Sequence, residues 1–300
     1  MLLFFTDTSV DAQEDFEDYL DYPDYLADQV QPSTTSWSYQ DQQSWGAHWP
    51  ECRGGRQSPV DIDTSLVAST PYLNLHFSRF NQPLFGYSVR AEDRAIRLRA
   101  AFKGPGPGIT GTALRWVPYQ LGAMSWHWGG HRGTGSEHSF NYVQYDAELQ
   151  LHFFSKKYGS LEVASLAPGS EGDNPRTSLP QPVAILSVLF KEANESNPRL
   201  EQLLEAIQVW ARLTNHSSSS SSNLEPFSSL EVPISEPIVL ADLFPLPDPV
   251  TDQWKVFTYR GSLTTPPCSE VVQYFVMAEV NAIGSEQVGK KYFEFFEFFK

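Results

Sequence analysis

The chain has 300 residues, of which 41% are hydrophobic and eight are Trp, so it can bury a substantial core in one large domain or two small ones. Its net charge of −15 argues against partners that need a basic surface, namely nucleic acids and anionic membranes. Two cysteines are too few for a disulfide-dense scaffold.

The acidity is concentrated in residues 1–36, which carry nine Asp or Glu and no Lys or Arg, so the remaining 264 residues account for only −6. We expect a disordered acidic tail, because its charge opposes compaction and Pro23 interrupts its aromatic spacing. Three roles stay open: a solvating tail, a segment that docks on a protein partner or carries sulfated tyrosines, and a set of carboxylates that binds calcium or mineral.

The chain after residue 36 is predicted to be strand-rich, because short apolar or alternating runs are separated by Gly, Pro and Ser. The predicted strands are 73–77, 95–101, 119–128, 147–154, 161–165, 183–190, 254–259 and 271–280. One helix is predicted after the N-cap Asn197, with Pro198 at its first position. Its apolar stripe consists of Leu200, Leu203, Leu204, Ile207 and Trp210.

The two ends of the chain carry further predictions. The apolar start, residues 1–5, is too short for a secretory signal, so no signal peptide is evident, and no run is long enough to span a membrane. Residues 217–222 are serines and predict a flexible loop. Residues 291–300 form an aromatic tail, interpreted either as a truncated or misread end or as a segment that binds a partner.

Two of the predicted strands place polar side chains together. Residues i and i+2 of a strand point to the same face, so Ser125 shares a face with His127, and Gln150 shares a face with His152.

Six sequence blocks occur in an order and spacing that resemble the α-class carbonic anhydrases over roughly residues 37–290. They are Trp-Ser-Tyr (37–39), Gly-Arg-Gln-Ser-Pro-Val-Asp-Ile (55–62), Ser-Trp-His-Trp-Gly (125–129), Gly-Ser-Glu-His (135–138), Ala-Glu-Leu-Gln-Leu (147–151) and Gly-Ser-Leu-Thr-Thr-Pro-Pro (261–267). The resemblance implies a mainly β (α+β) single domain, with a large twisted, mostly antiparallel sheet of about ten strands and short peripheral helices.

The resemblance implies a degenerate metal site. Family members hold zinc with three histidines, and the zinc-bound water becomes the hydroxide that attacks carbon dioxide. Ser125, His127 and Gln150 take the three ligand positions here, so only the second histidine is kept. This pattern resembles the carbonic anhydrase-related proteins, which keep the fold and lose the ligands, and no cofactor is expected. In an alternative, His152 substitutes for a lost ligand and zinc binds in a rearranged site.

The resemblance also assigns roles around the pocket. Thr264 and Glu137 match the pair that orients the hydroxide, and Glu148 matches the acid that supports the third histidine. Ala123 replaces the glutamine that supports the first histidine. Arg94 takes the place of the proton-shuttle histidine, and arginine does not release a proton near neutral pH. The remaining pocket positions are Leu263, Thr265, Ile185 and Tyr274.

The resemblance further implies a disulfide between Cys52 and Cys268, since secreted and membrane-bound family members pair cysteines at these places. A disulfide indicates an oxidising compartment. Two Asn-x-Ser sequons, at Asn194 and Asn215, agree with secretion and predict a glycoprotein.

Three functions are therefore expected as alternatives. The first is a secreted carbonic anhydrase-like protein that is catalytically inactive and acts as a binding or scaffold module for a protein partner. The second is an active or weakly active zinc carbonate dehydratase with a rearranged site. The third is an acidic matrix protein associated with calcium or mineral.

Overall fold

The computed structural model describes residues 37–69, 73–84, 87–92, 95–100, 105–170, 179–205, 207–209, 230–232, 238–243 and 255–288. The predicted acidic tail, the serine run and the aromatic tail lie outside these residues, as do Arg94 and Asn215.

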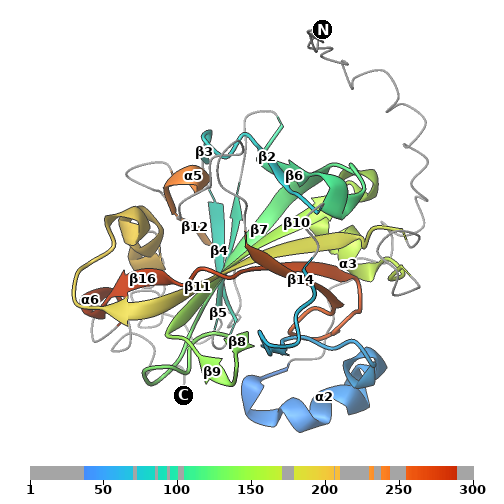
Figure 1. Cartoon of the computed structure of the whole chain (residues 1–300), viewed down its shortest axis with the longest axis horizontal. Coiled ribbons are helices and arrows are strands. Elements are labelled where there is room, and N and C mark those ends of the chain that lie inside the picture. The colour runs from blue at the N-terminus through green and yellow to red at the C-terminus, as the bar shows by residue number, and fades with distance from the viewer. Residues whose placement is uncertain are drawn as a thin grey trace, which may run out of the picture.

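A sheet of 11 strands crosses the molecule (Figure 1). Its main path is β12 (Leu230–Val232), β4 (Tyr87–Glu92), β5 (Ala95–Ala100), β7 (Tyr119–Trp128), β10 (Ala147–Ser155), β11 (Val183–Ala193), β15 (Val272–Met277) and β14 (Val256–Gly261). Off this path, β16 (Asn281–Gly284) pairs with β11, and β2 (His76–Ser78) pairs with β6 (Gly108–Thr110), which pairs with β7.

Most neighbouring strands are antiparallel, but β11 runs parallel to both β15 and β16. The predicted fold class, a large and mostly antiparallel sheet with short helices, is confirmed. Of the predicted strands, 119–128 matches β7 at both ends, whereas β4 was not predicted.

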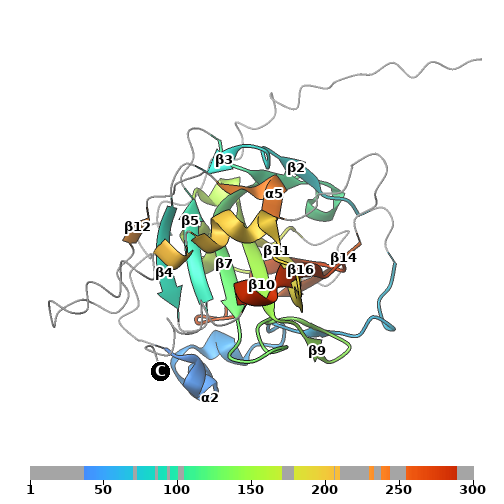
Figure 2. The same cartoon turned by 90° about the vertical axis from the view of Figure 1, so that its left-hand side faces the viewer.

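The predicted helix after Asn197 covers one face of this sheet. It begins with the short helix η6 (Pro198–Leu200), continues through helical residues 201–205 and 207–209, and is capped by the Asn197 side chain, which accepts from the Arg199 N–H. Figure 2 shows it in front of the strands together with α5 (Leu240–Leu243). Four members of its predicted apolar stripe belong to the larger buried cluster, which supports this prediction; they are Leu200, Leu203, Leu204 and Ile207. The fifth, Trp210, lies outside the described residues.

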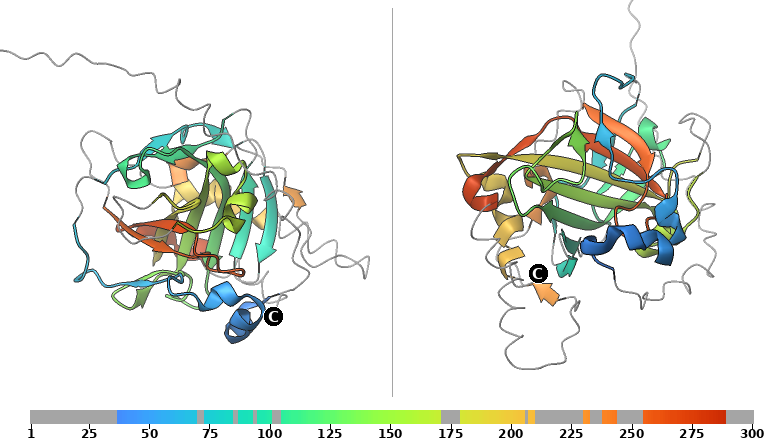
Figure 3. Two further views of the ribbon diagram at one scale, coloured as in Figure 1. Left: turned by 90° about the vertical axis from the view of Figure 1, so that its right-hand side faces the viewer. Right: turned by 90° about the horizontal axis from the view of Figure 1, so that it is seen from below.

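The predicted strand 161–165 is wrong, because this segment is the helix α3 (Leu161–Leu166). Ser160 caps it by accepting from the Val163 N–H at 3.2 Å, a local signal that outweighs the short apolar run. Leu161 and Ala164 lie one turn apart and pack into the second buried cluster, on the opposite side of the sheet from α5 (Figure 3).

The pairing of β7 with β10 contains a bulge that orients the candidate site. His152 pairs with Ala123 but Phe153 pairs with Leu121, so Gly122 is the extra residue. Leu121 consequently lies in the larger cluster while Ala123 lies in the second. A Cβ at position 122 would approach the Leu161 Cβ to 2.8 Å, so glycine lets α3 pack against the bulge.

The remaining elements are short. The amino-terminal part, outside the main sheet in Figure 1, contains η2 (Tyr39–Asp41), α2 (Gln42–His48) and η3 (Pro50–Arg53). A three-stranded sheet joins β1 (Asp61–Ile62), β8 (Ser139–Phe140) and β9 (Val143–Gln144), and β3 (Pro83–Leu84) pairs with β13 (Ile238–Val239). The others are η4 (Thr112–Leu114), η5 (Lys156–Tyr158) and α6 (Ser285–Val288). Within the described ranges, no helix has the length and apolarity needed to cross a membrane.

Candidate functional site

The candidate site lies on one face of β7 and β10, next to the bulge. Cα pairing sets Ser125 opposite Gln150, and His127 opposite Glu148. Cross-strand partners share a face, and so do residues two apart, so these four side chains and His152 all point to the same side of the sheet. The sequence prediction of one shared face on each strand therefore extends to a single face across both.

The Ser125 hydroxyl lies between two imidazoles. Its Oγ is 3.0 Å from Nε2 of His127 and 2.8 Å from Nε2 of His152. All three residues are buried, with 2–5% of their surface exposed. The two histidines are thus joined through Ser125, the residue that the resemblance places at the first ligand position.

The surrounding charges indicate which atoms carry protons in this group. Nδ1 of His127 is 3.6 Å from Oε1 of Glu137, so the proton on that ring is favoured at Nδ1, and Nε2 accepts from the Ser125 hydroxyl. Burial and the nearby charge of Arg97 lower the pKa of His152 well below its usual value, so that ring is neutral. Ser125 donates to His127, and it therefore accepts from the Nε2–H of His152.

Gln150, at the third ligand position, is held between two carboxylates. Its Nε2 donates to Oε2 of Glu137 at 2.7 Å and to Oε1 of Glu148 at 2.9 Å. Its Oε1 is buried and has no hydrogen-bond partner among the described residues. The amide therefore acts here as a donor that separates two acids.

Glu148 is the most strongly hydrogen-bonded of the retained residues. It is fully buried, and it accepts from the backbone N–H groups of Glu137 and His138, both at 2.9 Å, and from Nδ1 of His138 at 2.8 Å. Burial alone would raise the pKa of the Glu148 carboxyl, but the charge of His138 and the hydrogen bonds that His138 donates lower it to about 2.

His138 extends this network toward the carboxyl-terminal strands. Its Nε2 is 2.6 Å from the Tyr259 hydroxyl, which in turn donates to Ser58 at 3.0 Å. Burial raises the pKa of the Tyr259 hydroxyl, so Tyr259 remains protonated and able to donate at neutral pH. Glu148 is thereby connected through three side chains to the segment that precedes β1.

Thr264 and Glu137 do not form the hydrogen bond that the resemblance implies. Within the described residues, the Thr264 hydroxyl makes no hydrogen bond to Glu137, whose Oε2 is bound by Gln150 and whose Oε1 accepts from the Tyr39 hydroxyl at 3.4 Å. Thr264 is half-buried, as are its neighbours Leu263 and Thr265. Oε2 of Glu137 is bound by the Gln150 amide and not by the Thr264 hydroxyl.

The other predicted pocket residues separate into two groups. Ile185 is buried beside His152 on the neighbouring strand β11. Tyr274 is also buried, but its hydroxyl donates to the Ser262 carbonyl oxygen at 3.0 Å, and its ring stacks on Tyr259 at 4.9 Å. Tyr274 therefore supports the network around His138, away from Ser125.

Sequence reasoning missed Arg97, a half-buried residue on β5 that is the Cα partner of Ser125. Its position places a cation next to the two imidazoles, and its charge is one cause of the lowered pKa of His152. The signal available was the strand prediction at 95–101, whose pairing with β7 was not deduced.

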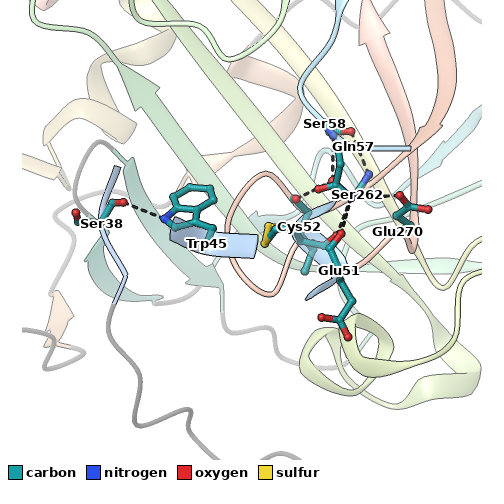
Figure 4. Close-up of a disulfide and its surroundings, with 10 residues drawn as sticks. Ser38, Trp45, Glu51, Cys52, Gln57, Ser58, Ser262 and Glu270 are labelled. Atoms are coloured by element: carbon teal, nitrogen blue, oxygen red, sulfur yellow. Dashed lines mark hydrogen bonds between the residues drawn. A yellow bond between two sulfur atoms is a disulfide. The ribbon is translucent and has the colours of Figure 1, made fainter. Parts of the chain in front are cut away.

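The predicted disulfide between Cys52 and Cys268 is confirmed, with its Cα atoms 4.9 Å apart (Figure 4). Around it, Nε2 of Gln57 donates to the carbonyl oxygens of Glu51 and Cys268, at 2.9 and 3.3 Å. Glu270 accepts from the Arg56 backbone N–H at 2.6 Å. These contacts attach the amino-terminal segment to the loop that carries Thr264.

The residues present do not fit the three-histidine zinc site that the resemblance implies. Ser125 and Gln150 are poor zinc ligands, and both are held by hydrogen bonds to neighbouring side chains. In the part of the chain that the structure describes, no three His, Cys, Asp or Glu side chains are placed to hold one metal ion. The site is a hydrogen-bonded cluster in which two imidazoles share one hydroxyl.

A comparison with protein families places the whole of this cluster inside one recognised domain. The family model described as eukaryotic-type carbonic anhydrase matches residues 40–295, which is well over half of the chain.

Proposed function

Because this chain belongs to the eukaryotic-type carbonic anhydrase family, we propose that it uses the family's fold as a binding module and does not hydrate carbon dioxide. The proposal rests on the chemistry of residues 125 and 150, since the hydration reaction needs a zinc-bound hydroxide.

The observation that carries the proposal is the hydrogen bonding of the two residues at the lost ligand positions. The Ser125 hydroxyl is shared between His127 and His152, and the Gln150 amide is bound to Glu137 and Glu148. A metal ion at this place would have to break these bonds and would gain one histidine from the family's set. Such a site favours a metal-free state.

The pair that would orient a hydroxide supports the same conclusion. Glu137 is engaged by Gln150, and no hydrogen bond joins it to Thr264. A catalyst needs this pair poised before the reaction, since orientation supplies much of the rate. The retained residues therefore act as parts of the buried network and have no catalytic role.

We propose that the protein is secreted. The cross-link between Cys52 and Cys268 is stable in oxidising compartments and rare in reducing ones. Asn194, in the first of the two sequons, is exposed and accessible to glycosylation. The tail at 1–36, with nine acids and no bases, is the proposed contact for a protein partner or calcium, and its deletion should abolish any calcium binding by the chain.

The test is zinc stoichiometry after incubation with excess zinc and exhaustive dialysis, combined with stopped-flow hydration of carbon dioxide. We expect the native chain to retain less than a tenth of an equivalent, roughly the level of a weak surface site, and to match a His127→Ala variant in both measurements. The proposal is wrong if the native chain keeps one equivalent that His127→Ala loses.

One observation favours the rearranged zinc site as a second candidate. His127 and His152 point their Nε2 atoms at the same Ser125 oxygen, so rotating the serine away would expose two imidazoles to one ion. This candidate requires zinc that is lost equally in His127→Ala and His152→Ala, together with hydration activity that aromatic sulfonamides inhibit. Zinc uptake without that double dependence would reject it.

A further inference from the structure

His152 is placed where it affects more than its own strand. Its Cα partner is Ala123, but its Nε2 reaches diagonally to within 2.8 Å of the Ser125 Oγ. The serine side chain ends at that atom. A histidine in the same rotamer would place its Cγ there and extend a ring beyond it, into the volume that the His152 imidazole fills.

The space on either side of position 125 is also occupied. Arg97 on β5 and Gln150 on β10 are its Cα partners, and Ser125 itself is only 2% exposed. A buried site of this kind accommodates a larger side chain only by displacing its neighbours.

We propose that His152 is a third block to metal binding, so that restoring the two lost histidines does not restore the zinc site unless His152 is also replaced by a small aliphatic residue. This inference rests on the proposed function, and it assigns to His152 the role of determining which side chain position 125 can hold.

Position 150 shows the opposite behaviour. Its side chain already lies 2.9 Å from the Glu148 Oε1, the acid that supports a histidine at this place in the family. Among the described residues its Oε1 has no hydrogen-bond partner, so replacing the amide removes no hydrogen bond to that oxygen. An imidazole at 150 would find its acceptor in place. The block is therefore specific to position 125.

Arg97 adds an electrostatic component to the same block. Arg97 is the Cα partner of Ser125 on the neighbouring strand β5, so a cation bound at position 125 would meet a fixed positive charge.

The first experiment measures zinc affinity with a competing chelator in three chains: S125H/Q150H, S125H/Q150H/H152V, and S125H/Q150H/H152F. We expect the valine chain to bind one equivalent, and the other two to bind roughly 10- to 100-fold more weakly. The phenylalanine chain is the matched control, because it removes the nitrogens of His152 but keeps a bulky ring. Cobalt substitution gives a second readout, since its visible spectrum reports tetrahedral coordination only in the valine chain.

A metal-free experiment keeps the inference testable if the triple variant does not fold. S125H should lower the thermal midpoint of the native chain by roughly 3–10 °C through overpacking, and by much less in an H152V background. Equal shifts in the two backgrounds would overturn the inference, as would tight zinc binding by S125H/Q150H.

Failure of the proposed function and failure of the inference about His152 would give different results. Zinc binding by the native chain contradicts the proposed function, because that chain carries none of these substitutions. Zinc binding by S125H/Q150H that equals the valine chain contradicts only the role of His152.

Discussion

The two sides of the candidate site are held together in different ways. Around Gln150, the neighbours Glu148 and His138 keep a buried network, into which the amide fits as one more donor. Around Ser125, only side chains take part, because His127 and His152 both reach the serine oxygen. The first side is closed by backbone and side-chain donors together, whereas the second consists of one hydroxyl shared between two imidazoles.

This difference teaches that two polar residues on one face of a sheet can be supported in different ways. The Glu148 network is also a structural element, since its carboxylate is bound by two backbone N–H groups. Among the described residues, no backbone donor reaches the Ser125 hydroxyl, so the polar groups on that side depend on one another.

The largest expected effect comes from breaking the hydrogen-bond network around Glu148. Glu148→Ala removes the acceptor of four hydrogen bonds from donors at Glu137, His138 and Gln150, and it should lower the free energy of unfolding by about 3–5 kcal/mol. Urea denaturation measures this change. As a control, Glu201→Ala on the exposed face of the helix should stay within about 0.5 kcal/mol. A loss under about 1 kcal/mol at Glu148 would contradict the structural role.

The Glu148 carboxylate should also make the stability of the fold sensitive to acid. The pKa of Glu148 is about 2 in the folded protein against an ordinary value of 4.5, so its ionised form stabilises the native state. That contribution is present above about pH 4.5 and is lost as the pH falls toward 2, and it is on the order of 3 kcal/mol. Urea midpoints between pH 7 and pH 3 should therefore fall more steeply for the native chain than for Glu148→Gln. Parallel curves would show that Glu148 does not contribute.

A smaller effect on stability is expected around Ser125. Ser125→Ala leaves the Nε2 atoms of His127 and His152 without their shared hydroxyl, and it should reduce stability by about 1–2 kcal/mol. Ser187 is the matched control, because it is equally buried on β11 and its hydroxyl has no hydrogen-bond partner among the described residues. Ser187→Ala should be neutral or stabilising. If both variants lose the same amount, the bridge between the histidines contributes nothing measurable.

The smallest effect is expected where the amino-terminal segment meets the site. Tyr39→Phe removes a hydroxyl that donates to Glu137 over 3.4 Å at a half-buried position, so it should change stability by less than about 1 kcal/mol. Thermal denaturation is sensitive enough for this comparison. A larger loss would mean that Tyr39, and not Gln150, is the main support of Glu137.

Much of the fold was accessible from the sequence because the central strands are long and strongly apolar. β7 and β10 were predicted within one residue of their ends, and the helix after Asn197 had both a cap and a stripe. The segment 161–166 was mistaken for a strand because six residues are too few to show a helical period, and the capping by Ser160 was not considered.

The candidate site was accessible only in part. Strand periodicity placed Ser125 with His127 and Gln150 with His152, but it carried no information on which strands were neighbours. The register between β7 and β10 depends on the bulge at Gly122. An isolated glycine inside a predicted strand indicates a bulge, but this signal was not used. The contact of His152 with Ser125, and the place of Arg97 beside both, follow from that register.

The disulfide between Cys52 and Cys268 has a consequence for proteolysis of the protein. Cys52 and Cys268 are 216 residues apart, and every strand from β1 through β14 lies between them. A single protease cut at the exposed Tyr142 would put β7 and β10 on different fragments, although they are neighbours in the sheet. Both fragments would remain covalently attached through the sulfurs. A nicked molecule should therefore migrate as one band without reductant and as two bands once reductant is added.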